Sequence, residues 1–230
     1  TSKITYMEDG SRLLSDEKGH NTTFTQGNRF GVRLEHKFSE KTSILFEPQF
    51  NFGAGHFNEF ADFSTANLSE GASAATKVND GYNSNTGANK NWSTSGFLLF
   101  RQKLGKDGRT ISANIRYSFS DNNMYGFNQS LTTVYDLQTG AGSDDPVNQR
   151  YDQNSKSTSL SGRVVYTEPL GGGFFLETNY QYGWNKNTSF KNTFNSATDD
   201  LIEDLLVYNG VGEIPDPVYS NSINSISQNH

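Results

Sequence analysis

The alternation of side chains between Phe174 and Trp184 limits the possible folds of this chain more than any other feature. Apolar or aromatic side chains occupy most second positions of this segment, and mostly polar side chains lie between them. A period of two is that of a β-strand, in which successive side chains point to opposite faces. The stretch from Leu160 to Tyr166 alternates in the same way, and glycines 171–173 separate the two. The sequence therefore predicts a β-hairpin with one apolar and one polar face.

The same pattern recurs and predicts three long hairpins, over about 28–63, 91–135 and 156–186. A fourth strand pattern begins near residue 221, so the hairpins start at a spacing of roughly 63 to 65 residues. Pro48 interrupts the first hairpin, and we expect a bulge or a local edge there because proline has no N–H to donate to the ladder.

Between the hairpins lie segments rich in Ser, Asn and Gly, which we expect to be long loops. These segments are residues 64–90, 137–156 and 186–219. Residues 1–27 are polar and are expected to hold the end of one strand followed by a loop. Connections would then alternate between short turns and long loops.

Composition excludes several classes of protein. Hydrophobic residues make up 33% of the chain and the mean hydropathy is -0.70, yet aromatic residues reach 13%, which argues against disorder. The net charge is -6 without a basic cluster, so we expect no nucleic-acid partner. The absence of cysteine excludes disulfides and thiolate sites. The sequence contains no run of about 18 apolar residues, so it predicts no transmembrane helix.

Alternation alone is compatible with a β-sandwich and with a membrane barrel. Strands of about ten residues exceed the globular mode of about 5 to 6 and match those that cross a bilayer. The polar faces are mostly Ser, Asn, Gln and Thr, as in a wet lumen. Aromatic residues gather toward strand ends, as in an interfacial girdle; they are Phe38, Trp92, Tyr117, Phe119, Tyr182 and Trp184.

We therefore expect an all-β fold: an antiparallel up-and-down meander of long hairpins, forming one segment of a transmembrane β-barrel over residues 1–230. The surroundings of eight apolar residues separate this fold from a sandwich. They face outward in a barrel and meet a second sheet in a sandwich; they are Phe30, Val32, Leu34, Leu98, Ile111, Ile115, Leu176 and Tyr180.

Three segments carry a resemblance to one family: YTEPLGGGFFLETNYQYGW, FSEKTSILFEPQFNF and DPVYSNSIN. Together they resemble the barrel domains of TonB-dependent-receptor-like outer-membrane proteins of Gram-negative bacteria, over about residues 28–230. The resemblance implies a barrel of about 22 strands around a plugged lumen in the outer membrane. It also implies nutrient import, with outer-membrane lipid, the remaining barrel and plug, and a TonB-type complex as partners.

The chain begins and ends in mid-pattern and contains about six predicted strands, so we expect a fragment of a larger barrel. A different interpretation is a secreted or surface β-sandwich that binds carbohydrate or protein through its long loops. Aromatic residues in or near those loops could stack on a sugar; they are Tyr82, Tyr125, Phe127 and Tyr151. A third possibility is a passive, porin-like barrel without a plug.

The polar faces carry two Arg–Glu pairs at the same interval across a predicted turn. Arg33 precedes Glu47 by fourteen residues, and Arg163 precedes Glu177 by the same interval. Registers centred near Glu40 and near Leu170 would place each arginine opposite its glutamate. The sequence thus predicts two structural charge pairs on the lumen face, each worth at most about 1 kcal/mol when solvated.

No other pattern indicates a catalytic site, a cofactor or a metal, and we expect no enzyme activity. The histidines are dispersed without ligand spacing; they are His20, His36, His56 and His230. An acidic stretch, which overlaps a possible helical turn over 200–206, could bind calcium but lacks the spacing of an EF-hand loop, so a solvated loop is favoured. Its acidic residues are Asp199, Asp200, Glu203 and Asp204.

Overall fold

The chain forms one antiparallel β-sheet, seen in a computed structural model that describes residues 1–196 and 212–229. Within those residues there is no helix. The strands are β1 (Ser2–Tyr6), β2 (Arg12–Gly31), β3 (Leu34–Lys37), β4 (Thr42–Leu68), β5 (Thr76–Lys103), β6 (Thr110–Tyr135), β7 (Gly142–Gly171), β8 (Phe174–Asn195), β9 (Ile214–Pro215) and β10 (Asn221–Asn229).

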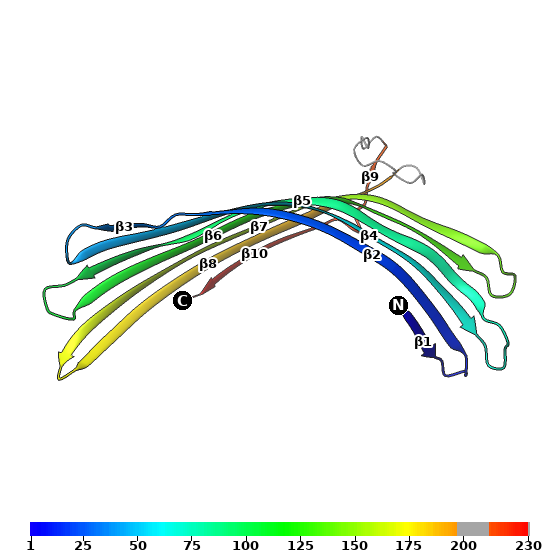
Figure 1. Cartoon of the computed structure of the whole chain (residues 1–230), viewed down its shortest axis with the longest axis horizontal. Coiled ribbons are helices and arrows are strands. Elements are labelled where there is room, and N and C mark those ends of the chain that lie inside the picture. Colours follow the sequence, from blue (N-terminus) through cyan, green and yellow to red (C-terminus); the bar gives the residue numbers. More distant parts are fainter. Residues whose placement is uncertain (197–211, 230) are drawn as a thin grey trace.

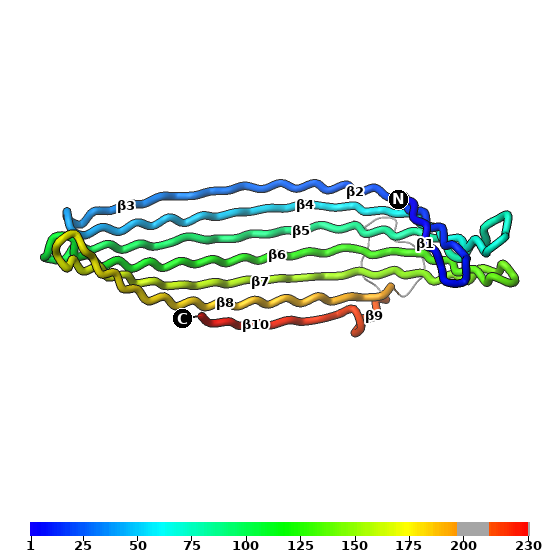
Figure 2. Tube along the Cα trace, turned by 90° about the horizontal axis from the view of Figure 1, so that it is seen from below, coloured from blue at the N-terminus to red at the C-terminus, as the bar shows by residue number. Residues whose placement is uncertain are grey.

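The sheet is an up-and-down meander, as predicted. The strand order is β1-β2-β4-β5-β6-β7-β8-β10, while β3 pairs with β4 and β9 pairs with β8. The long strands run side by side in a single layer (Figure 2), and this layer is bowed along the strand direction (Figure 1). The second sheet that a sandwich requires is not found among the described residues.

The strands are much longer than the sequence predicts, and most of the expected loops are strands. Residues 64–90 hold the end of β4 and the first half of β5, joined by a turn over 69–75. The expected loop over 137–156 is largely β7, and β8 continues to Asn195. Most of residues 1–27 likewise belong to β1 and β2.

The physical reason is that ladder hydrogen bonds join backbone groups and do not require apolar side chains. In these segments both faces are mostly polar, so the regular alternation that reveals a half-buried strand is missing. A consequence is that the connections from β1 to β8 are short at both ends of the sheet, rather than alternately short and long, whereas β8 and β10 are joined by a longer connection over 196–220. One end carries the turns over 38–41, 104–109 and 172–173, and the other carries those over 7–11, 69–75 and 136–141.

Pro48 interrupts the pairing of the neighbouring strand rather than the course of its own strand. Strand β4 continues through Pro48 without a bulge, and the Val32 N–H donates to the Pro48 carbonyl at 3.0 Å. Proline cannot donate a bond in return, and the ladder is interrupted here between Gly31, where β2 ends, and Leu34, where β3 begins. Bulges lie elsewhere, at Thr65/Ala66 and at Pro169/Gly171.

Little of the sheet is covered. Only three hydrophobic residues are buried in the described chain: Leu45, Phe127 and Tyr151. Tyr151 is buried because it lies over Gly126, where an added Cβ would come within 2.5 Å of the Tyr151 hydroxyl. Phe127 and Tyr151, which the sequence placed in or near a ligand-binding loop, are therefore strand residues packed into the sheet.

Candidate functional site: an apolar band on one face of the sheet

Strand register gathers apolar side chains from neighbouring strands onto one face. Phe46 lies opposite Leu98, and Leu98 lies opposite Ile115 on the next strand. We call this surface the apolar band. Its principal members, from β4 to β8, are Ile44, Phe46, Phe50, Phe52, Trp92, Leu98, Phe100, Ile111, Ala113, Ile115, Tyr117, Phe119, Leu160, Val164, Leu176, Tyr180, Tyr182 and Trp184.

The apolar band extends onto β2 and β3 and is widely accessible. Phe30 lies opposite Phe50, and Leu34 lies opposite Phe46. Phe30 is 61% exposed, Ile115 47% and Tyr180 62%. Such side chains gain about 1.5 to 3 kcal/mol each when they are fully removed from water. Covering the band with an apolar environment would therefore be favourable, and the described part of the chain does not cover it.

The height of the apolar band is that of a strand crossing a bilayer. On β4 it covers the nine residues from Ile44 to Phe52, or roughly 27 Å at about 3.4 Å per residue. Transmembrane strands need about 9 to 11 residues. β4 itself has 27 residues, so a large part of it extends beyond the band.

A row of aromatic and charged side chains ends the apolar band on the side away from the 38–41 turn. Phe52 lies opposite Trp92, which lies opposite Asp121. The Trp92 and Phe119 rings have centroids 4.8 Å apart, and Lys156 forms an ion pair with Asp121 at 3.6 Å. Ring and ion pair thus occupy one level, as expected where an apolar medium meets water.

The opposite face of the same strands is mostly polar, and its apolar members include Leu45, Phe97, Leu99 and Val165. One row crosses five strands with only Asn and Ser, and its members are Asn51, Ser93, Ser120, Ser157 and Asn187. The Asn51 amide donates to the Ser93 hydroxyl at 3.2 Å. The sheet therefore has one apolar face and one mostly polar face.

The structure brings Arg33 and Glu47 together in an ion pair on the polar face. Leu34 lies opposite Phe46 and Gly31 opposite Gln49, so the register is centred on Glu40 as the sequence predicts. Arg33 also lies 3.4 Å from Glu35, and its side chain is 60% exposed. An exposed pair of this kind contributes about 1 kcal/mol or less.

The second predicted pair, Arg163 with Glu177, is not formed. Arg163 lies opposite Gln181, whereas Glu177 lies opposite Thr167. The two side chains share the polar face but are four residues apart along the strands, or roughly 13 Å. The register is centred on Gly172 instead of Leu170, because Gly171, Gly172 and Gly173 all adopt positive φ and form the turn themselves.

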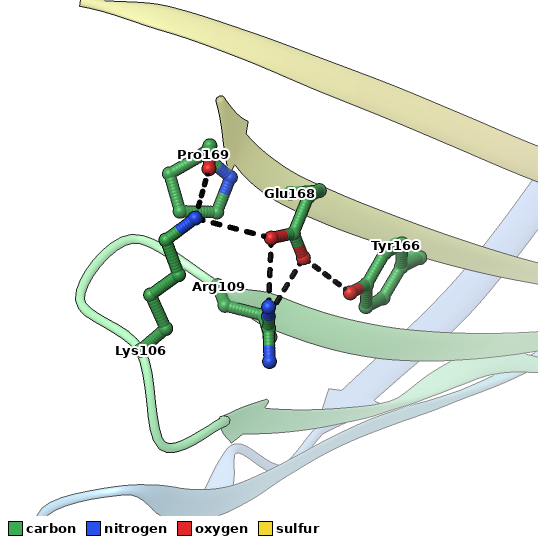
Figure 3. Close-up of polar contacts among 5 residues, drawn as sticks. All are labelled: Lys106, Arg109, Tyr166, Glu168 and Pro169. Atoms are coloured by element: carbon green, nitrogen blue, oxygen red, sulfur yellow. Dashed lines mark hydrogen bonds and ion pairs between the residues drawn. The ribbon is translucent and has the colours of Figure 1, made fainter. Parts of the chain in front are cut away.

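A polar cluster that the sequence did not reveal joins two hairpins at the end of the sheet (Figure 3). Glu168 of β7 accepts hydrogen bonds from the Arg109 guanidinium at 2.6 and 2.7 Å, and from the Tyr166 hydroxyl. Lys106, from the turn between β5 and β6, lies 3.3 Å from the same carboxylate and also donates to the Pro169 carbonyl. We call these residues the hairpin clip.

The hairpin clip shifts the ionisation of its members. The Arg109 guanidinium, assisted by the Tyr166 hydroxyl, lowers the pKa of Glu168 to about 2. Conversely, the Glu168 carboxylate raises the pKa of Arg109. Arg109 and Glu168 are 59 positions apart in sequence, so only the strand register could have revealed that they meet.

A second cluster fastens the segment after residue 212 to the far end of the sheet. Arg150 of β7 donates to both Glu213 oxygens at 2.7 and 2.8 Å and lies over the Phe194 ring at 4.4 Å. The Glu213 carboxylate raises the pKa of Arg150. Asp216 accepts from the Asn195 amide at 2.9 Å, which lowers the pKa of Asp216.

Metal-ligating groups are not clustered in the part of the chain that the structure describes. No group of three or more His, Cys, Asp or Glu side chains able to hold a metal ion occurs in residues 1–196 and 212–229. His20 instead lies beside the Phe60 ring and His56 stacks on Phe24. The acidic stretch within 199–204, the possible helical turn over 200–206 and His230 lie outside the described residues.

In the part of the chain that the structure describes, no helix is long and apolar enough to cross a membrane. No known protein family matches this sequence, and no curated protein matches it significantly.

Proposed function

We propose that this chain is a wall segment of an outer-membrane barrel that imports a nutrient. In this proposal the apolar band faces lipid and the opposite polar face lines the lumen. The turns over 38–41, 104–109 and 172–173 lie on the periplasmic side. The long polar ends of β4 to β8 extend beyond the outer surface of the membrane.

One observation carries the proposal: an uncovered apolar band, about one bilayer-crossing strand in height, lies on one face of a sheet whose other face is rich in Ser and Asn. In a sandwich a second sheet would cover the band, and in a bilayer lipid covers it. The aromatic end of the band, with Phe52 and Trp92, supports the same orientation because aromatic girdles flank the lipid-facing surface of such barrels.

Energy-coupled import through a TonB-type complex is supported by the resemblance of the hairpin segments, including YTEPLGGG and its return strand. It can be tested separately from membrane insertion. Cells that lack the protein and cells that lack the energising complex should lose uptake of the same nutrient to the same extent. Uptake that persists without the energising complex would favour a passive, porin-like barrel.

Lipid contact can be tested with the tryptophans of the chain. There are only two, Trp92 and Trp184, and both belong to the apolar band. The protein is inserted into vesicles whose acyl chains carry bromine, a short-range fluorescence quencher. In the variant W184F, the remaining Trp92 should be strongly quenched by brominated lipid and weakly by iodide in the buffer.

The control moves the indole by one residue to the polar face. In W92F/W184F/S93W the new tryptophan lies at the level of Trp92 but points away from the apolar band, because neighbouring strand residues alternate. It should be quenched by iodide instead. Equal quenching of both variants by brominated lipid, or a soluble monomer that does not bind vesicles, would overturn the proposal.

A further inference from the structure

Three arginines surround one asparagine on the polar face of the sheet. Arg163 lies directly opposite Asn114, and Arg116 lies two residues along the strand from Asn114 on the same face. Arg101 lies opposite Ser112 and thus diagonally across from Asn114. Diagonal neighbours have Cβ atoms about 7 to 8 Å apart, so three guanidinium groups can reach the same point above the sheet. We call this the arginine triad.

The positive charges of the arginine triad are not neutralised by the described chain. None of Arg101, Arg116 and Arg163 forms an ion pair in residues 1–196 and 212–229, and all three side chains are exposed. The nearest carboxylate along the Arg116 row is Glu47, two strands away and already paired with Arg33.

The surroundings of the arginine triad add neutral hydrogen-bonding groups. Ser112 and Ser161 lie directly opposite Arg101 and Arg116, and Asn114 lies in the centre. On the β5 side, the apolar residues Phe97 and Leu99 lie opposite Arg116 and Asn114. Guanidinium groups present paired N–H donors that match the two oxygens of a carboxylate or phosphate. Hydroxyl and amide groups can complete the coordination of further ligand oxygens.

We propose that the arginine triad is a binding site for a small molecule bearing several carboxylate or phosphate groups. Charge complementarity specifies an oxyanion, and the spread of the three arginines specifies more than one anionic group. The inference rests on the proposed function only in that such an anion would be, or would resemble, the imported molecule. Binding itself depends on the sheet alone.

The test is calorimetric titration of the full chain in detergent micelles with citrate, a tricarboxylate, and in parallel with inorganic pyrophosphate. The variant R101Q/R116Q/R163Q should weaken binding by about tenfold or more, since several charged hydrogen bonds are lost. The matched control K18Q/K90Q/K186Q removes the same charge from the opposite face and should change the affinity less than about twofold. Tighter binding of citrate or of pyrophosphate identifies carboxylate or phosphate as the preferred group.

A single, charge-conserving substitution tests the site if the triple substitution impairs folding. R163K retains the charge and loses the planar fork, so it should weaken citrate binding several-fold while far-UV circular dichroism is unchanged. Absence of citrate and pyrophosphate binding to the unmodified chain, or equal losses in triad and control variants, would overturn the site. Anion binding without lipid quenching of Trp92 would overturn the proposed function alone, and quenching without anion binding would overturn only the site.

Discussion

Arg109 and Glu168 form a two-point ion pair that joins neighbouring hairpins at one end of the sheet, with contacts of 2.6 and 2.7 Å. Arg109 precedes β6, whereas Glu168 lies near the end of β7. Lys106 and the Tyr166 hydroxyl bind the same carboxylate (Figure 3). The β5–β6 turn is thereby fixed against the turn that follows β7.

The hairpin clip predicts a pH dependence of stability. The pKa of Glu168 is about 2 in the folded chain and 4.5 by its ordinary value, so the unfolded chain binds the proton more tightly. The stability from the ionised carboxylate is complete above about pH 4.5 and is lost as the pH falls toward 2. In urea titrations, E168Q should be less stable than the unmodified chain at neutral pH, and this difference should vanish near pH 2.

Glu177 provides the control for that experiment, because it lies on the next strand and forms no ion pair in the described chain. E177Q should leave the unfolding midpoint nearly unchanged at neutral pH. A difference between E168Q and the unmodified chain that stays constant from pH 7 to pH 2 would contradict the role given to Glu168.

The contrast between the two Arg–Glu pairs shows what the sequence could predict. Alternation assigned the faces correctly, and the short turn around Glu40 fixed the register that brings Arg33 to Glu47. Around Gly172, three successive glycines leave several turn positions open, and a bulge at Pro169/Gly171 adds another. A shift of two residues in the turn centre moves the opposing residues four positions apart, which separates Arg163 from Glu177.

The polar halves of the strands show which strands the alternation of side chains cannot predict. Residues 81–90, which the sequence predicts as part of a loop, carry only Tyr82 and Ala88 as apolar side chains, yet each of these residues has a partner in β4. Period-two reasoning detects strands that separate an apolar from a polar environment. It could find the apolar band but not its continuation, nor contacts between strands distant in sequence, such as the hairpin clip.

Gly96 predicts a steric requirement inside the apolar band. A Cβ at this position would lie 2.6 Å from the Glu47 carbonyl oxygen and 3.1 Å from the Tyr117 ring. The backbone carbonyl cannot move freely, so G96A should destabilise the chain by about 1 to 3 kcal/mol. Gly162 lies on the same face with nothing within 4 Å of its added Cβ.

G162A is therefore the matched control, and it should be neutral or slightly stabilising because alanine loses less backbone freedom on folding. Denaturant unfolding in micelles measures both variants. Equal effects of G96A and G162A would show that the close approach of Glu47 and Tyr117 does not restrict position 96.

The contacts of Arg150 predict that the segment carrying β9 is held locally against the sheet. Its two bonds to Glu213 leave that carboxylate side chain 9% exposed. Charged hydrogen bonds contribute about 1.5 to 3 kcal/mol, so E213Q should increase the opening of this segment by roughly tenfold or more. Hydrogen exchange of the Asp216 amide, which donates to the Thr193 carbonyl at 2.8 Å, measures that opening.

The control for this fastening is K191M, because the Lys191 side chain lies over the nearby Tyr151 ring, and only its backbone pairs with Asn221 of β10. Its Asp216 amide should exchange as in the unmodified chain. If E213Q and K191M exchange alike, the ion pair with Arg150 does not hold the segment against the sheet.

Leu98 and Ser95 predict opposite responses to the same substitution, because they lie on opposite faces of β5 close to the middle of the apolar band. Leu98 lies between Phe46 and Ile115, whereas Ser95 lies between Gln49 and Ser118 on the polar face. In lipid vesicles, L98R should cost about 2 to 4 kcal/mol, since its charge would enter the hydrocarbon. S95R should cost less than about 0.5 kcal/mol, because its side chain remains in water. Free energies of unfolding from vesicles measure both variants, and equal costs would mean that the two faces meet the same solvent, which is incompatible with a membrane wall.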